Sequence, residues 1–174
     1  MKDETRMLAF WLLPASPARE YFQSLIEDLA QRFDAPAFEP HLTLYGAPFD
    51  DAKYSLLPGM QLSGSVELEI EGIEFSEKYT KTLFVQFRLE AELTELSAAV
   101  ARAFGNENGP ELNPHLSLIY KTMPNAEKEE LARTLQLPFN RVRFEVVKAV
   151  VTPSTIDSRE GVESWRTVWE KSLL

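Results

Sequence analysis

The chain contains two histidines, and both stand in the same short pattern. Pro40-His41-Leu42-Thr43-Leu44 recurs as Pro114-His115-Leu116-Ser117-Leu118, at an offset of 115 minus 41, or 74, residues. Residues i and i+2 of a strand share a face, so each histidine points the same way as the hydroxyl residue that follows it. Two imidazoles on facing strands could take a proton on one side of a bound group and supply one on the other.

Each histidine has a simpler interpretation when it is considered alone. A single histidine on a strand is more often a structural or surface residue than a catalyst, and duplication explains why the two copies are alike. However, the chain has no other histidine, and both are preceded by proline and followed by Leu-(Thr/Ser)-Leu. We therefore interpret His41 and His115 as a catalytic pair, and Thr43 and Ser117 as hydrogen-bond donors to phosphate oxygens.

Metal and nucleophile chemistry find little support in the sequence. A zinc site normally needs three or four clustered ligands, and the chain has no cysteine and no HxH or HExxH motif. It also lacks the G-x-S-x-G elbow of serine hydrolases. The sequence therefore predicts neither a metal nor a cofactor.

The same offset relates the elements on either side of the two motifs. Phe22, Ile26 and Leu29 form one helical stripe, Pro17 stands near its start, and Gly105 is a plausible end for the corresponding second helix. The related pairs are strands 8–13 and 82–89, helices 18–33 and 91–104, shorter helices 50–57 and 125–135, and strands 64–75 and 139–151. A final strand at 164–172 has no counterpart. The pattern predicts an α+β fold in which residues 1–174 form a single bilobal domain with two pseudo-symmetric halves.

Composition limits the partners of the chain. It has 174 residues, of which 44% are hydrophobic, and its formal net charge is −9, so a broad nucleic-acid or anionic-membrane surface is not expected. No apolar run approaches the roughly 20 residues of a membrane-spanning helix. Asp3, Glu4 and Pro14 make residues 7–14 a first strand rather than a signal peptide. We expect a cytoplasmic monomer that does not bind membranes.

The two motif strands resemble a known family. HLTLYG at 41–46 and HLSLIY at 115–120 are similar to the paired motifs of the 2H (two-histidine) phosphoesterase superfamily, and within it to the cyclic phosphodiesterases of plants and yeast. The resemblance implies two antiparallel sheets facing a central cleft, with helices packed outside. It also implies metal-independent hydrolysis of a cyclic phosphodiester, either ADP-ribose 1″,2″-cyclic phosphate or a nucleoside 2′,3′-cyclic phosphate.

Further side chains are weaker candidates for substrate contacts. The resemblance places Tyr120 near the substrate, although strict alternation from His115 puts it on the opposite face unless a bulge or the strand end turns it. Trp11 is either a stacking surface for a base or a core residue. Trp165 and Trp169 share a face of the last strand and are expected in the core. Lys121 is either a phosphate contact or a solvated lysine.

Two other functions remain open from the sequence. The same chemistry could act on the cyclic phosphate end of RNA, for which a basic groove around Lys78, Lys81, Arg141 and Arg143 would be needed. Alternatively, the chain could be a non-catalytic nucleotide-binding module in which the histidines only contact phosphate. The preferred partner is a small nucleotide or sugar cyclic phosphate.

Overall fold

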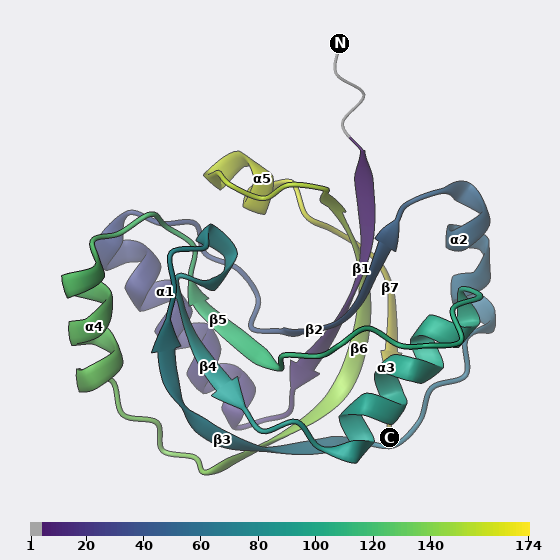
Figure 1. The fold of residues 1–174 in the computed structure, drawn as a ribbon, viewed down its shortest axis with the longest axis horizontal. Helices are drawn as coiled ribbons and strands as arrows, with labels where there is room; N and C mark the ends of the chain where they lie inside the picture. The colour runs from purple at the N-terminus through teal and green to yellow at the C-terminus, as the bar shows by residue number, and fades with distance from the viewer. Residues whose placement is uncertain (1–4) are drawn as a thin grey trace.

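A computed structural model describes residues 5–174, in which seven strands form one antiparallel sheet with helices packed outside it (Figure 1). The strands are β1 (Arg6–Pro14), β2 (Leu42–Pro48), β3 (Val66–Phe75), β4 (Leu83–Phe87), β5 (His115–Ile119), β6 (Arg141–Pro153) and β7 (Arg166–Ser172). The helices are α1 (Ala18–Phe33), α2 (Asp51–Leu56), α3 (Ala91–Ala103), α4 (Asn125–Thr134) and α5 (Arg159–Glu163), with 3₁₀ turns η1 (Leu57–Gly59) and η2 (Tyr79–Lys81).

Every strand and helix expected from the sequence is present, with ends that shift by a few residues. Pro17 occupies the N-cap position of α1, and Gly105, with φ +79°, follows the end of α3. The first strand is also confirmed, although Asp3 and Glu4 lie outside the described residues. The short helix α5 was not expected, because five residues are too few to show a helical stripe; Ser158 caps it by accepting from the amide of Gly161.

The strand order gives the sheet a symmetric form. The order is β1-β2-β5-β4-β3-β6-β7, and β6 also pairs with β1, so six strands form a ring. If β1, β2 and β3 trade places with β4, β5 and β6, respectively, every strand of the ring keeps an equivalent set of neighbours. The α+β class is thus confirmed, with one refinement: the two expected sheets are joined into one by the pairings of β2 with β5 and of β3 with β6.

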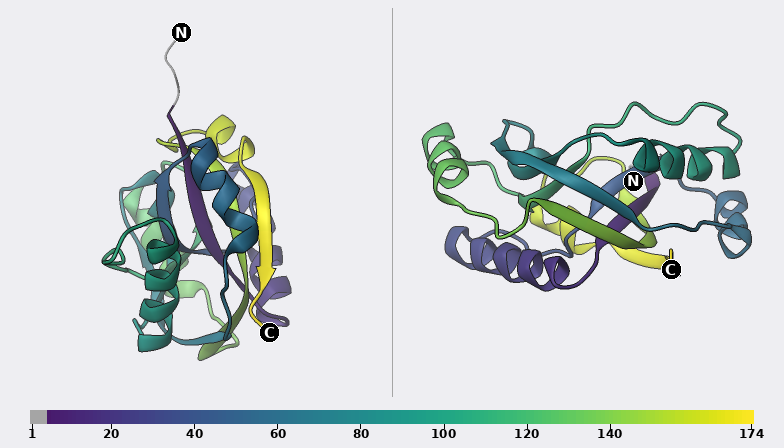
Figure 2. Two further views of the ribbon diagram at one scale, coloured as in Figure 1. Left: turned by 90° about the vertical axis from the view of Figure 1, so that its right-hand side faces the viewer. Right: turned by 90° about the horizontal axis from the view of Figure 1, so that it is seen from below.

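Each half of the chain covers the other half with its long helix. Helix α1 packs on β5, whereas α3 packs on β2, and both lie outside the strands (Figures 1 and 2). A buried hydrogen bond of 2.7 Å from the Ser97 hydroxyl of α3 to the Leu44 carbonyl of β2 fixes one of these contacts. The strands that carry the motifs are therefore supported from behind by helices of the opposite half.

Alternation along the strands separates a core face from a polar face. Leu42, Leu44, Leu116 and Leu118 are fully buried in the main core. Burying a leucine side chain contributes about 1.5–3 kcal/mol, so these four residues hold the two motif strands firmly in register. The intervening histidine and hydroxyl side chains face the other way. Within the described residues, no helix is long and apolar enough to cross a membrane.

Candidate active site

The two motifs meet where β2 pairs with β5. Leu42 and Leu116 are register partners in this antiparallel pair. Since neighbouring positions follow in opposite order on antiparallel strands, His41 lies beside Ser117, and Thr43 lies beside His115. The register thus places the four polar residues of the two motifs around one point on the same face of the sheet.

A cavity of about 300 Å³ opens at this point. It is lined by all six residues that the sequence predicted as catalytic, phosphate-binding or possible substrate contacts: His41, Thr43, His115, Ser117, Tyr120 and Trp11. It is also lined by seven other residues, namely Ala9, Lys78, Thr80, Lys81, Thr152, Ile156 and Trp165. None of the described lining residues carries a carboxylate, so the cavity is cationic although the chain is acidic.

The two imidazoles are oriented in the same way. Nδ1 of His41 lies 2.7 Å from the carbonyl oxygen of Glu39, and Nδ1 of His115 lies 2.8 Å from that of Asn113. A carbonyl oxygen only accepts, so Nδ1 of each ring carries the hydrogen. In the neutral ring Nε2 is then an unprotonated acceptor, as a general base requires.

Side chains from neighbouring strands fix the two residues that orient the histidines. Lys148 of β6 donates to both carboxylate oxygens of Glu39, at 2.7 and 3.0 Å. In the other half, buried Gln86 of β4 donates to the Asn113 side chain at 2.8 Å and to the Pro114 carbonyl at 3.0 Å. Each histidine therefore has an orienting carbonyl and a second residue that holds the carbonyl-bearing segment in place.

Aromatic rings surround the two histidines unequally. His41 is 7% exposed and stacks on Trp11, with ring centroids 3.7 Å apart, while the edge of Trp165 meets it at 5.7 Å. His115 is partly exposed and meets Phe84 at 5.5 Å, nearly perpendicular. Trp11 lies opposite Thr43, and Phe84 lies opposite Ser117, so the two rings occupy equivalent places in the two halves.

Burial lowers the pKa of both histidines. Burial, opposed by the Glu39 carbonyl and reinforced by the charge of His115, brings the pKa of His41 to about 4. Burial also lowers the pKa of His115, with a contrary contribution from the Asn113 carbonyl and further lowering by the ammonium groups of Lys81 and Lys78. Neutral imidazoles are thus favoured in this cavity.

The two hydroxyl residues differ in their hydrogen bonding. Ser117 is buried, and its hydroxyl donates to the Thr80 carbonyl at 2.7 Å. Thr43 is exposed to the cavity, and the described residues include no partner for its hydroxyl. Thr43 is therefore free to donate to a ligand, whereas Ser117 would first have to rotate away from Thr80.

Two of the aromatic residues considered from the sequence, Tyr120 and Trp11, lie at the cavity. Strand β5 ends at Ile119, so alternation no longer governs Tyr120, which lines the cavity and stacks on Phe38 at 4.2 Å. Trp11 is 6% exposed, as a core residue would be, and also lines the cavity, while its stacking on a base stays a prediction. Burial raises the pKa of Tyr120 above its usual value, so the phenol stays protonated.

Two expectations change in part. Trp165 and Trp169 both pack against the core, as expected, but they do not share a strand face: Trp165 precedes β7 and contacts Trp11 on the cavity side, whereas Trp169 contacts Phe10. A register shift in β7 between the partners of Ala149 and Val150 breaks the alternation, and no sequence signal marks it. Lys121 does not line the cavity, because its ammonium group donates to the carbonyl of Phe33 at the end of α1.

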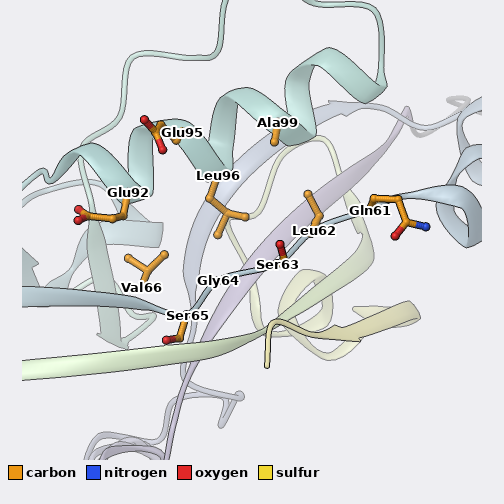
Figure 3. A pocket seen from close by; sticks show the side chains of 10 residues that line it. All are labelled: Gln61, Leu62, Ser63, Gly64, Ser65, Val66, Glu92, Glu95, Leu96 and Ala99. Atoms are coloured by element: carbon orange, nitrogen blue, oxygen red, sulfur yellow. The ribbon is translucent and has the colours of Figure 1, made fainter.

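A second cavity has a different character. It has a volume of about 350 Å³ and lies between α3 and residues 61–66 (Figure 3). Its ionisable lining residues are Glu92 and Glu95, with no histidine or cation. It would repel a phosphate, so the cavity between the motifs is the site that fits the chemistry. Among residues 5–174, no group of three or more histidine or carboxylate side chains is placed to hold a metal ion.

The chain is similar to a known family and to a curated relative. The model of the family described as the 2'-5' RNA ligase superfamily matches residues 13–152. A cyclic phosphodiesterase of Arabidopsis thaliana is 23% identical over 164 residues, which cover 91% of this chain and 90% of that protein.

Solved structures show a similar fold. E. coli LigT in its apo form has a TM-score of 0.58 at 15% identity and covers 98% of both chains. Its complex with 3'-AMP has a TM-score of 0.58 at 16% identity, covering 98% of this chain and 99% of that one. TT0787 of Thermus thermophilus has a TM-score of 0.58 at 15% identity, covering 96% of this chain and 97% of that one. These likenesses establish the fold.

Proposed function

Because the chain belongs to the 2'-5' RNA ligase superfamily, we propose that it hydrolyses a cyclic phosphodiester with His41 and His115 as an acid/base pair. The observation that carries the proposal is that both rings line one cavity, each with Nδ1 bound to a backbone carbonyl and Nε2 left for the substrate. The proposed substrates are ADP-ribose 1″,2″-cyclic phosphate and nucleoside 2′,3′-cyclic phosphates. The relative from Arabidopsis thaliana, a cyclic phosphodiesterase, supports this class.

In the proposed mechanism one histidine activates water and the other protonates the leaving oxygen. His41 is the more buried ring, so a single proton shared by the pair rests on His115. We therefore assign His41 as the base: Nε2 takes a proton from water while the water oxygen forms a bond to phosphorus. The bond from phosphorus to one ribose oxygen breaks, and His115 gives that oxygen its proton. The product is a phosphomonoester.

The hydroxyl residues and the fold complete the proposal. Thr43 donates to a non-bridging phosphate oxygen, where negative charge gathers in the transition state. Ser117 has one of two roles. Either its hydroxyl rotates and also donates to a non-bridging phosphate oxygen, or it keeps its hydrogen bond to the Thr80 carbonyl and holds Thr80 in place. The reaction is proposed to need no metal, since a proton donor, a proton acceptor and neutral donors supply the chemistry. Residues 1–174 are proposed to act as one bilobal domain with the site between its halves.

Product analysis tests the proposal. The purified protein is incubated in excess chelator with ADP-ribose 1″,2″-cyclic phosphate, adenosine 2′,3′-cyclic phosphate and an RNA that ends in a cyclic phosphate. We expect the small substrates to be opened to single phosphomonoesters. Faster opening of the RNA would shift the function to RNA end processing, and binding of the small substrates without turnover would make the protein a nucleotide-binding module.

A further inference from the structure

A buried lysine on α4 binds the chain segment that forms one wall of the cavity. This connecting segment, residues 76–82, joins β3 to β4. Three of its residues line the cavity, namely Lys78, Thr80 and Lys81. Lys128 of α4 is 3% exposed, and its ammonium group donates to the Ser76 carbonyl at 2.7 Å. The contact therefore ties the wall of the cavity to α4, a helix that contributes no residue to the cavity itself.

Burial of this ammonium group is costly for the fold. Within the described residues Lys128 forms no ion pair, whereas Lys148, which is also largely buried, pairs with Glu39. Lys128 also lies 5.9 Å from the centre of the Phe75 ring, at the limit of a cation–π contact. A buried charge without a carboxylate costs stability, and Leu131 is buried on α4 one turn later without that cost. A leucine could not donate to a carbonyl, so the hydrogen bond is what the lysine adds.

Ser76 holds the connecting segment in its conformation. Its amide donates to the Thr82 carbonyl at 3.2 Å. Its hydroxyl donates to the Lys81 carbonyl at 2.5 Å and accepts from the Lys78 amide at 3.2 Å. With the bond from Lys128 to its carbonyl, every polar group of Ser76 has a partner. The two lysines of the segment are therefore positioned through Ser76, which is itself bound to α4.

The position of these two lysines matters for His115. The titratable side chains that line the cavity with His115 are His41 before β2, Tyr120 after β5, and Lys78 and Lys81 of the connecting segment. Burial is the main cause of the lowered pKa of His115, the Asn113 carbonyl opposes it, and the two ammonium groups lower the pKa further. A lower pKa makes the protonated ring a stronger acid towards the leaving oxygen.

We propose that Lys128 is a positioning residue of the active site, which holds the connecting segment against α4 so that its two ammonium groups stay at a fixed distance from His115. Only the kinetic consequence of this inference rests on the proposed function. If the segment loses its bonds to Lys128 or within Ser76, the ammonium groups spend more time in solvent and further from the ring. The pKa of His115 should then rise towards its ordinary value, because more distant cations oppose its protonation less.

Titration of the histidine ring signals by NMR tests the inference without any substrate. The chain has two histidines, and a His41→Gln background assigns the signal of His115. Lys128→Met removes the ammonium group, whereas Ser76→Ala removes the hydroxyl that holds the segment and leaves the charge of the chain unchanged. We expect the titration midpoint of His115 to rise by about 0.3 or more in both variants. Thermal unfolding checks that each variant is folded.

Lys53→Met is the matched control. The Lys53 ammonium group also donates to a backbone carbonyl, that of Pro48 at 2.7 Å, but lies outside the cavity, so this variant should leave the midpoint of His115 unchanged. An unchanged midpoint in Ser76→Ala would overturn the inference even if Lys128→Met does not fold. A rise confined to Lys128→Met would be the direct effect of its own charge and would also overturn it.

Kinetics separate a failure of this inference from a failure of the proposed function. With adenosine 2′,3′-cyclic phosphate, the upper inflection of kcat/KM against pH should rise together with the midpoint of His115 in Lys128→Met and Ser76→Ala. Raised midpoints in a protein that opens no cyclic phosphate would support the positioning role and refute the proposed activity. Turnover with the same pH profile in the wild type and both variants would refute the positioning role and leave the activity intact.

Discussion

The imidazole of His41 lies face to face with the indole of Trp11, at 3.7 Å between ring centroids and 13° between planes. Its counterpart, His115, meets Phe84 at 71°. The two motifs are close copies in sequence, yet the ring of His41 is stacked and buried while that of His115 is partly exposed. This inequality allows two identical side chains to hold different protonation states, as an acid and a base must.

Replacing either histidine should nearly abolish turnover. A general acid or base typically contributes about 10²- to 10⁴-fold, so His41→Ala and His115→Ala should each lower kcat/KM by factors in that range. Circular dichroism and thermal unfolding serve as controls for the fold. Full activity in either variant would remove that histidine from the mechanism.

Thr43 and Ser117 should respond differently to the loss of their hydroxyls. Thr43→Ala removes a donor that faces the cavity, and we expect kcat/KM to fall by about 10- to 10³-fold with little change in unfolding free energy. Ser117→Ala also breaks the buried hydrogen bond to Thr80 and should destabilise the protein by about 1 kcal/mol. Urea unfolding and steady-state kinetics measure both effects. Equal stability losses in the two variants would contradict the distinction.

The sequence predicted which side chains lie together, because their directions are encoded locally. The i, i+2 spacing fixed the direction of His41 and Thr43, and the repeat brought His115 and Ser117 to the equivalent strand. The closure of six strands into one ring was not visible in the sequence, because the pairing of β2 with β5 is non-local.

What the sequence could not show depends on irregular local geometry. Trp165 reaches the cavity from the residue that precedes β7, and Thr80 reaches it from a short 3₁₀ turn. Neither feature has a periodicity that could be detected. Lys78 and Lys81 were noticed as charges in the sequence, but their place beside His115 follows only from the connection between β3 and β4.

Gln86 should act as a positioning residue for His115. Gln86→Met would remove the donors to Asn113 and Pro114 while keeping a side chain of similar length, and we expect a loss of about 2 kcal/mol in stability. A displaced His115 should lower kcat by about 10-fold with a smaller change in KM, since the ring's alignment matters most in the transition state. The exposed Gln61→Met provides a matched control. An unchanged kcat in Gln86→Met would limit this residue to a structural role.

The pH dependence of the reaction should follow the lowered pKa values of the pair. One imidazole must be neutral and the other protonated, so a plot of kcat/KM against pH should be bell-shaped. Its two inflections should report the macroscopic pKa values of the histidine pair. Since burial lowers the pKa of both, the maximum should lie between pH values of about 4 and 6.5. The profile should persist in excess chelator. Activity that disappears with chelator and returns with added metal would instead indicate a metal-bound nucleophile.

The folded protein should lose stability between pH 6.5 and 4 because His41 is buried in its neutral form. The pKa of His41 falls from 6.5 to about 4 on folding. Between these pH values His41 is therefore protonated in the unfolded chain and neutral in the folded protein. Stability is therefore present above pH 6.5 and falls as the pH is lowered towards 4, by about 3 kcal/mol for this residue. Urea unfolding across this range should show the loss in the wild type, and His41→Gln should lack that part of it. Carboxylates titrate in both proteins and cancel in the difference. Parallel stability curves for the two proteins would mean that His41 is not held neutral by the fold.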